Sequence, residues 1–441
     1  MSLSATLVRS PSLLQQHELE TAVCRALCCD LAALENLDLG AEKSGAASEG
    51  YLSQCGSMTV KAVVKGRPHT LHLFVKRENT KEVVEGLEAF QREGLFYESV
   101  LPHLDKAWNN VKAAESDEHA ASRVGAAAFL GTDSVVVMED LTRRGYKAIS
   151  DWQWNDIPYQ TVQQTLRALA RLHASSLVAE RVCGVDLAAE VPELMEENFL
   201  TRRPGIVGRR IFDVASDLVA QYILPRIFSR LKVPQTAFEL RRLQDLTRDI
   251  WTEMDLPKLR EREAVRAISN GDVWPNNVLV RHDSQGQVAH AIVVDFQMVH
   301  LGPPALDVAM FLRTSMRRAH RQRNEESLVR EYHDDLVRFC QQRGLDLSKD
   351  FGWEDFKASL ARVEPVARGI ACAYNPMIRG NEAEMEETFK ESAARSAMLL
   401  ESAARADMIL RWMESDEAYL ELMIEIVEDV LGLPASASTK Q

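Results

Sequence analysis

Two short segments combine residue types that could bind a metal ion and support transfer of a phosphoryl group. One is Asn270-Gly271-Asp272-Val273-Trp274-Pro275-Asn276-Asn277, and the other is Asp295-Phe296-Gln297. Carboxylate and amide oxygens are hard donors, which suit Mg²⁺ better than zinc. An Asp, an Asn and a second Asp that meet at one point would therefore form a magnesium site. The plainer alternative is a polar hairpin whose acids cap its turns.

The segment between these residues explains how they could meet. Residues 277–296 (NVLVRHDSQGQVAHAIVVDF) predict two apolar strands around the turn DSQG. Asn277 opens the first strand and Asp295 closes the second, so antiparallel pairing brings both to the same open end. Asp272 lies in the loop that leads into this end. The sequence therefore predicts that Asp272, Asn277 and Asp295 converge.

A lysine and a glutamate in the first third of the chain could complete a phosphate site. Lys76 ends the predicted strand LHLFVK, and Glu93 lies in a helix predicted over residues 80–101, beside Phe90, Phe96 and Tyr97. A carboxylate next to such an apolar stripe requires a cationic partner. A Lys–Glu pair of this kind holds the lysine toward the phosphates of a nucleotide. The alternative is an edge-strand lysine and a solvated glutamate.

The segment Gly50-Tyr51-Leu52-Ser53-Gln54-Cys55-Gly56 is expected to be a loop before the first strand. Free backbone N–H groups in such a loop, including those of Gly50 and Ser53, could bind phosphates. The pattern is not GxGxxG, and the chain contains no GxxxxGK[ST]. A P-loop enzyme is therefore excluded.

The elements that must position these residues form a strand-rich first third and a mainly helical remainder. An amphipathic helical segment is expected over 12–37. Strands MTVKAVV and TLHLFVK flank the turn KGRP, and AAAFLG and SVVVMED follow as two more strands. From Trp152 the chain reads as helices with one hairpin, and the repeated ESAARSAMLL and ESAARADMIL (391–410) predict one long helix. This order is not the alternation of a doubly wound sheet.

Composition narrows the classes of function. The 441 residues carry a net charge of −13, which argues against nucleic acid or an anionic membrane as a partner. Seven irregularly spaced cysteines suggest neither a zinc site nor a disulfide framework. The sequence contains no run of about 18 apolar residues, so no membrane span is predicted. The first residues do not resemble a signal peptide. We therefore expect a cytoplasmic protein, in which Mg²⁺ and Lys76 offset the repulsion of a bound nucleotide.

These motifs together resemble the ecdysteroid kinase-like (CHK kinase-like) family, in the protein-kinase-like superfamily near choline and aminoglycoside kinases. The family pattern HGDxWxxN corresponds to residues 270–277, and its DFQ to 295–297. The strand lysine corresponds to Lys76, FxxExxFY to residues 90–97, EDL to 139–141, and the Asp of GPPxxDL to Asp307. The resemblance runs from about Gly50 to about Leu312.

The resemblance implies a role for each of these residues. Asp272 would be the catalytic Asp, while Asn277 and Asp295 would hold Mg²⁺. Lys76 would contact the phosphates of ATP and pair with Glu93. Residues 138–141 would form the interlobe hinge. Its backbone, at Glu139 and Leu141, would contact adenine. Asp307 would brace the catalytic loop.

The resemblance also implies the architecture and the reaction. We expect an α+β, bilobal protein-kinase-like fold, with a small antiparallel-sheet N-lobe (1–138), a large mainly helical C-lobe (139–433) and a disordered tail (434–441). The expected activity is transfer of the γ-phosphoryl group of ATP to a hydroxyl of a small molecule, such as an ecdysteroid or another sterol or lipid alcohol. A monomer is expected.

One departure from the family pattern leaves an alternative open. Asn270 replaces the family histidine before Gly271 and Asp272. An asparagine can also donate and accept hydrogen bonds, so it could keep the loop in place and contribute to catalysis there. The alternative is a catalytically impaired protein of the same fold that binds ATP or another ligand.

Overall fold

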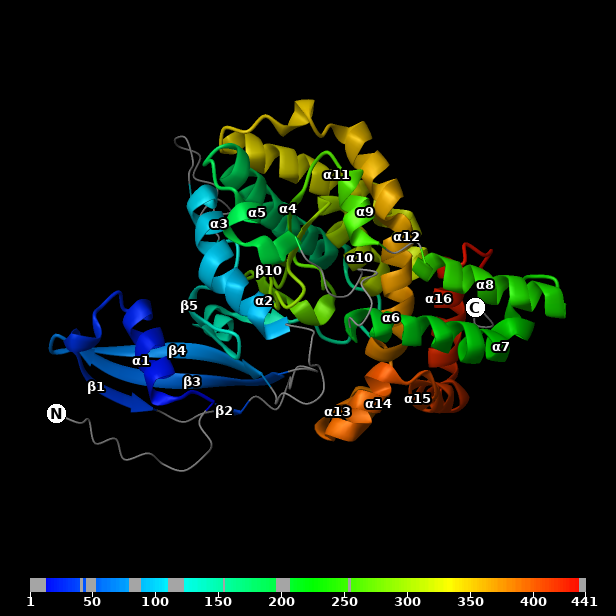
Figure 1. Cartoon of the computed structure of the whole chain (residues 1–441), viewed down its shortest axis with the longest axis horizontal. Helices are drawn as coiled ribbons and strands as arrows, with labels where there is room; N and C mark the ends of the chain where they lie inside the picture. The colour runs from blue at the N-terminus through cyan, green and yellow to red at the C-terminus, as the bar shows by residue number, and fades with distance from the viewer. Residues whose placement is uncertain are drawn as a thin grey trace.

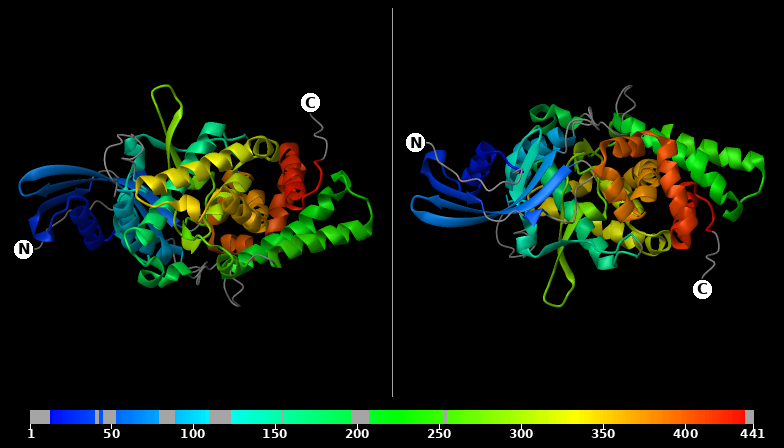
Figure 2. Two further views of the ribbon diagram at one scale, coloured as in Figure 1. Left: turned by 90° about the horizontal axis from the view of Figure 1, so that it is seen from above. Right: turned by 90° about the horizontal axis from the view of Figure 1, so that it is seen from below.

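The computed structural model describes residues 13–39, 43–44, 53–78, 89–109, 123–153, 155–195, 207–252 and 255–435. An antiparallel sheet forms the N-terminal region, and helices form most of the rest, so the fold is α+β as expected (Figure 1). Figure 2 shows the sheet at one end of the long axis and the helices of residues 207–252 at the other. No helix among the described residues is long and apolar enough to cross a membrane.

The N-terminal sheet has the strand order β1-β3-β4-β6-β5, with β2 paired to β3. The expected hairpin joins β3 to β4 through Lys65 and Gly66, whose φ values of 48° and 74° form the tight turn that such hairpins favour. Helix α1 covers one face of the sheet and shares a small apolar core with it. The elements of this region are α1 (Gln16–Ala26), β1 (Leu34–Leu39), β2 (Lys43–Ser44), β3 (Ser53–Val64), β4 (Arg67–Glu78), β5 (Ala128–Gly131) and β6 (Val135–Glu139).

The helix that carries Glu93 lies between the sheet and the helical region. It runs as α2 (Ala89–Leu95), a π-helical turn (Phe96–Val100) and α3 (Leu101–Trp108), and so extends beyond the predicted end at residue 101. Its apolar side chains join the large core of the helical region. Gly94 allows the close approach of the residue that follows β5, because a Cβ there would lie 2.1 Å from the backbone oxygen of Thr132. Residues 80–88 of the predicted helix lie outside the described residues.

The helical region surrounds three short strand pairings. Strands β9 and β10 form the expected hairpin with β7 at its edge, and β8 pairs with β11. The strands are β7 (Tyr146–Ala148), β8 (Ala267–Ser269), β9 (Val278–His282), β10 (Val288–Val293) and β11 (His300–Gly302). The helices are α4 (Tyr159–Arg181), α5 (Leu187–Glu190), α6 (Val207–Asp217), α7 (Leu224–Ile227), α8 (Ala237–Thr252), α9 (Leu256–Glu261), α10 (Pro304–Ser315), α11 (Arg318–Gln342), α12 (Trp353–Ile378), α13 (Glu382–Lys390), α14 (Ser392–Leu400), α15 (Ser402–Ser415) and α16 (Glu417–Val430).

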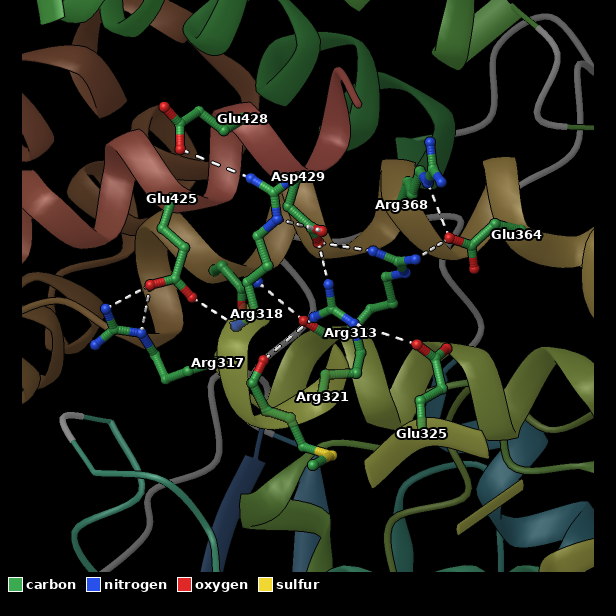
Figure 3. A network of polar contacts seen from close by, with 12 residues as sticks. Arg313, Arg317, Arg318, Arg321, Glu325, Glu364, Arg368, Glu425, Glu428 and Asp429 are labelled. Atoms are coloured by element: carbon green, nitrogen blue, oxygen red, sulfur yellow. Dashed lines mark hydrogen bonds and ion pairs between the residues drawn. The ribbon is translucent and has the colours of Figure 1, made fainter. Parts of the chain in front are cut away.

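An ion-pair network ties the C-terminal helix α16 to α10 and α11 (Figure 3). Asp429 is its centre, with Oδ2 at 2.7 Å from Nη1 of Arg313 and 2.6 Å from Nη2 of Arg321. One turn earlier, Glu425 lies 2.6 Å from Arg317. Arg313 belongs to α10, the helix that carries Asp307. The ion pair with Asp429 therefore anchors α10 to α16.

Three local predictions are wrong. Residues 34–37 of the expected helical segment belong to strand β1, because they pair with β3. Residues 53–56 belong to β3 rather than to a loop, because they pair with residues 75–78 of β4. The repeat over 391–410 is broken at Glu401, which has an extended backbone, and forms the two helices α14 and α15.

An arginine in each copy of the repeat explains why the helix is interrupted. In each copy, the arginine four residues after the glutamate folds back on the end of the preceding helix. Arg395 donates to the carbonyl of Phe389, and Arg405 donates to the carbonyl of Met398 at 2.8 Å. A cation at the last carbonyls of a helix satisfies acceptors that have no partner within the helix. Each copy therefore ends one helix and begins the next.

Candidate active site

Lys76 lies between two carboxylates from distant parts of the chain. Its Nζ is 2.8 Å from Oε2 of Glu93 and 2.9 Å from Oδ1 of Asp295. The side chains of Lys76 and Glu93 are 7% and 1% exposed, whereas that of Asp295 is 26% exposed. The ion pair predicted between Lys76 and Glu93 is thus present, and it is buried. The third member, Asp295, joins the strand lysine to the hairpin of the helical region.

The charges in this trio perturb one another. Burial acts to lower the pKa of Lys76, but the carboxylates of Asp295 and Glu93 outweigh it and raise the pKa above its usual range. Burial raises the pKa of Glu93 to about 7; Asp295 adds to this rise, and Lys76 opposes it. One ammonium therefore neutralises only part of the charge of two carboxylates. A further cation would be favoured beside Asp295.

The segment that leads into the hairpin holds Asp272 and Asn277 together. Asn277 donates from Nδ2 to the backbone oxygen of Asp272 at 2.8 Å and to its Oδ2 at 2.9 Å. Gly271 has a φ of 80°, and a Cβ there would lie 2.4 Å from the oxygen of Met298. Only glycine fits this position without a shift of the backbone. The glycine thereby lets this loop lie against the segment that follows Asp295.

Asn270 connects the two segments directly. Its Nδ2 donates to the backbone oxygen of Asp295 at 2.8 Å and to that of Val294 at 3.3 Å, and its Oδ1 accepts from the backbone N–H of Asp272 at 3.0 Å. The side chain is fully buried. Both the donor and the acceptor of the amide are thus used. The side chain predicted to hold the loop in place of histidine does so through its own hydrogen bonds.

Asp307, at the start of α10, binds the backbone of the same loop. Its carboxylate accepts the backbone N–H of Asn270 at 2.8 Å and that of Gly271 at 3.1 Å. His173 on α4 is fully buried, with Nε2 3.2 Å from Oδ2 of Asp307 and Nδ1 2.7 Å from the hydroxyl of Tyr332. The bracing expected of Asp307 is present. His173 is a buried histidine with a partner on each side.

The backbone turn at Asp295 is held by aromatic packing. Asp295 has a φ of 61°, a left-handed conformation that is uncommon outside glycine. The next residue, Phe296, is buried and stacks on Phe96 with ring centroids 3.6 Å apart. Tyr97 meets the same ring edge-on. The helix that supplies Glu93 therefore also fixes the turn that directs Asp295.

Asp272 lies in a setting that weakens its acidity. Burial raises its pKa to about 7, and the charge of Asp295 adds to the rise. Hydrogen bonds from Tyr374, Trp274 and Asn277 oppose it. Tyr374 comes from α12, where its ring stacks on Phe212 of α6 and its hydroxyl lies 3.6 Å from Sδ of Met298. This carboxylate could accept a proton near neutral pH.

A tryptophan and an arginine outside every motif support the far side of the loop. Trp152 donates to Oδ1 of Asn276 at 2.9 Å and meets the ring of Trp274 edge-on. Arg379 is fully buried over the ring of Trp152 and donates to the carbonyls of Trp152 and Thr314. Sequence reasoning missed both residues, because nothing in their local spacing indicates a contact across more than 100 residues.

The other predicted nucleotide-binding residues are placed as follows. Ser53 is buried at the start of β3, two residues before Cys55, which pairs with Lys76 in the sheet. The carboxylate of Glu139 accepts the backbone N–H of Ala127 at 2.9 Å, and Leu141 is buried. Gly50 lies outside the described residues.

The donor set fits magnesium. Asp272, Asn277 and Asp295 offer two carboxylates and one amide oxygen, and Mg²⁺ is commonly held by one or two carboxylates together with phosphates and waters. Oδ1 of Asp295 makes no hydrogen bond within the described residues, although it faces Lys76. Among the residues that the structure describes, no cluster of three or more His, Cys, Asp or Glu residues is suited to hold a metal. The site thus suits a cation shared with a phosphate ligand better than a closed structural metal centre.

The chain matches one family model and aligns with several solved structures. Residues 47–345 match the model of the ecdysteroid kinase-like family. Among solved structures, a choline kinase from Cryptosporidium parvum Iowa II aligns over 94% of this chain and 98% of its own, at 9% identity and a TM-score of 0.43. The GDP complex of wild-type aminoglycoside 2'-phosphotransferase-IIIa aligns over 90% and 93%, at 11% identity and a TM-score of 0.32. A search of curated proteins found no match.

Proposed function

Because the chain belongs to the ecdysteroid kinase-like family, we propose that it is an ATP- and Mg²⁺-dependent kinase that phosphorylates a hydroxyl group of a small molecule. The observation that carries the proposal is the position of Lys76, 2.8 Å from Glu93 and 2.9 Å from Asp295. This arrangement joins the proposed phosphate-binding lysine to a proposed metal ligand. The family suggests an ecdysteroid or another sterol or lipid alcohol as the acceptor. We further propose a cytoplasmic monomer as the working form.

In this proposal the N-terminal region (1–138) and the helical region (139–433) bind ATP between them. Lys76 contacts the phosphates, and Glu93 keeps its ammonium extended. The backbone of the hinge at Glu139 and Leu141 meets adenine, and the segment around Gly50 and Ser53 borders the phosphates. Phosphoryl transfer requires positioning and charge neutralisation more than covalent chemistry, which suits this set of residues.

Asp272 is the proposed catalytic residue. It orients the acceptor hydroxyl and accepts its proton as the oxygen attacks the γ-phosphorus. A pKa of about 7 matches that task, because a base works best when its pKa lies near the working pH. Asn270 holds Asp272 close to Asp295, and Asp307 holds the backbone of the loop that carries Asp272.

Asn277 and Asp295 are the proposed magnesium ligands. Bound Mg²⁺ would supply positive charge to the phosphate oxygens, which the acidic chain as a whole does not. Nδ2 of Asn277 is bound to Asp272, so Oδ1 is the ligand atom that this amide offers. Asp295 would divide its charge between Lys76 and the metal.

The test is phosphoryl transfer from labelled ATP in the presence of Mg²⁺ to a panel of sterols, other hydroxylated lipids and choline. Asp272→Asn should lower the rate by about 10²–10⁴-fold while ATP binding is kept. Asp334→Asn, at a side chain that is 59% exposed on α11, is the matched control and should leave the rate unchanged. Full activity of Asp272→Asn would refute the assignment. ATP binding without transfer to any acceptor would favour the impaired-enzyme alternative.

A further inference from the structure

Helix α1 ends in a motif built from three cysteines. Leu27 caps the helix, and Cys28 follows in the left-handed conformation, with a φ of 49°. The N–H of Cys28 donates to the carbonyl of Arg25 at 3.2 Å, and that of Cys29 donates to the carbonyl of Cys24 at 2.9 Å. This pair of hydrogen bonds defines a Schellman motif. In that motif the two residues joined by the outer bond bring their side chains into contact, and here both are cysteine.

The two thiols are close to each other and close to the surface. The thiol of Cys29 shares a hydrogen bond with that of Cys24, and both residues are half-buried. A groove of about 500 Å³ runs beside them and is lined by Cys24, Cys28 and Cys29. All seven cysteines are free thiols. A small reagent can therefore enter at a place where a second thiol is already in contact with the first.

We propose that Cys24 and Cys29 are a redox-modification site that forms an intramolecular disulfide by exchange with a low-molecular-weight disulfide such as oxidised glutathione. One thiolate attacks the reagent and releases the first reagent thiol. The second cysteine then attacks this mixed disulfide and releases the second. Two S–H bonds are lost and one protein S–S bond forms. The two protons and the two electrons pass to the reagent, which is reduced to two thiols.

The position of the pair gives the modification a target. The disulfide closes a loop that contains Arg25, whose Nη1 lies 2.6 Å from Oε2 of Glu98 in the helical run that carries Glu93. Helix α1 is also joined to the sheet, through the ion pair of Glu18 with Arg77, the neighbour of Lys76. Oxidation would therefore act on the helix that contacts both elements of the Lys76–Glu93 pair.

Peptide mapping tests the proposal without any reference to kinase activity. Trypsin cleaves after Arg25, so residues 10–25 and 26–43 become separate peptides that only a disulfide can join. The full-length protein is treated with oxidised glutathione, blocked with N-ethylmaleimide and digested. The linked peptide should exceed the Cys24–glutathione adduct by about tenfold, because the second thiol is local.

Two variants identify the partner of Cys24. Cys28→Gly keeps the motif, since glycine favours the left-handed position, and it should give as much linked peptide as the wild type. Cys29→Ser should lose the link. Separate glutathione adducts on Cys24 and Cys29 in the Cys28→Gly protein would overturn the proposal, as would an undiminished link in Cys29→Ser. The Cys28→Gly result decides by itself if Cys29→Ser does not fold.

Discussion

Replacement of Asn270 measures how the two halves of the site are held together. Asn270→Ala removes two hydrogen bonds donated to the carbonyls of Asp295 and Val294 and one accepted from the N–H of Asp272. A typical hydrogen bond contributes about 1 kcal/mol net, and a buried group left without a partner costs about 1–3 kcal/mol. Since the side chain is fully buried, we expect the free energy of unfolding to fall by about 2–4 kcal/mol.

A second variant separates hydrogen bonding from packing. Asn270→Asp keeps the shape, but the new carboxylate places an oxygen where Nδ2 meets two carbonyls, and it adds charge near Asp272 and Asp295. At pH 7 we expect a larger loss of stability than for Asn270→Ala. The carbonyls raise the folded-state pKa of the new carboxyl above its unfolded value of about 4. The loss should therefore grow as the pH rises from about 4 through the folded-state pKa, and it should shrink at acidic pH.

Urea unfolding followed by tryptophan fluorescence, at pH 5 and pH 7, measures both effects. Asn324→Ala is the control, because Asn324 makes one partly buried bond to the carbonyl of His320 within α11. It should change stability by about 1 kcal/mol or less. If both Asn270 variants unfold within about 0.5 kcal/mol of the wild type at pH 7, the bridging role of Asn270 is refuted.

Three further predictions concern buried titratable groups. Lys76→Met leaves two carboxylates without their shared cation, so stability should fall by about 3–5 kcal/mol in chemical unfolding, and nucleotide titration should show weaker binding; unchanged values in both would contradict the site. Burial lowers the pKa of His300 to about 4, below the usual 6.5, so the unfolded chain takes up the proton first and stability should fall by about 3 kcal/mol as pH drops from 6.5 to 4. His300→Gln should remove that acid-dependent loss in urea titrations at several pH values, and an unaltered pH profile would count against it. Asp429→Ala removes the carboxylate that Arg313 and Arg321 share and leaves them only Glu364 and Glu325, so thermal and urea unfolding should show a loss of about 3 kcal/mol. A loss below about 1 kcal/mol would mean that the network is not stabilising.

The features that sequence predicts best are those set by neighbours along the chain. The turn at Lys65 and Gly66, the pairing of β9 with β10 and the shared end of Asn277 and Asp295 all follow from short spacing and the alternation of apolar residues. Asn277 and Val294 indeed meet at that end, through a hydrogen bond from the N–H of Val294 to the oxygen of Asn277. The α+β class and the family were predicted correctly for the same reason, because motif spacing is a local property.

The predictions that failed depend on hydrogen bonds that helix and strand preferences do not include. Residues 34–37 carry a pattern compatible with a helix, but pairing with β3 satisfies their backbone groups in a strand. The repeat over 391–410 has strong helical character throughout, yet Arg405 caps the end of α14 and the chain turns at Glu401. In the first case pairing with another strand outweighs local preference, and in the second an arginine cap within the repeat itself interrupts the helix.

By itself the sequence determined the family and the candidate residues, because Asp272, Asn277, Asp295 and Lys76 are fixed by type and spacing. Only the tertiary structure decided how their charges are shared. Lys76 serves Asp295 as well as Glu93 across more than 200 residues, and the buried amide of Asn270 joins Asp272 to Asp295. Such contacts depend on how the sheet packs against the helical region, and the strength of each charge depends on the water that this packing excludes.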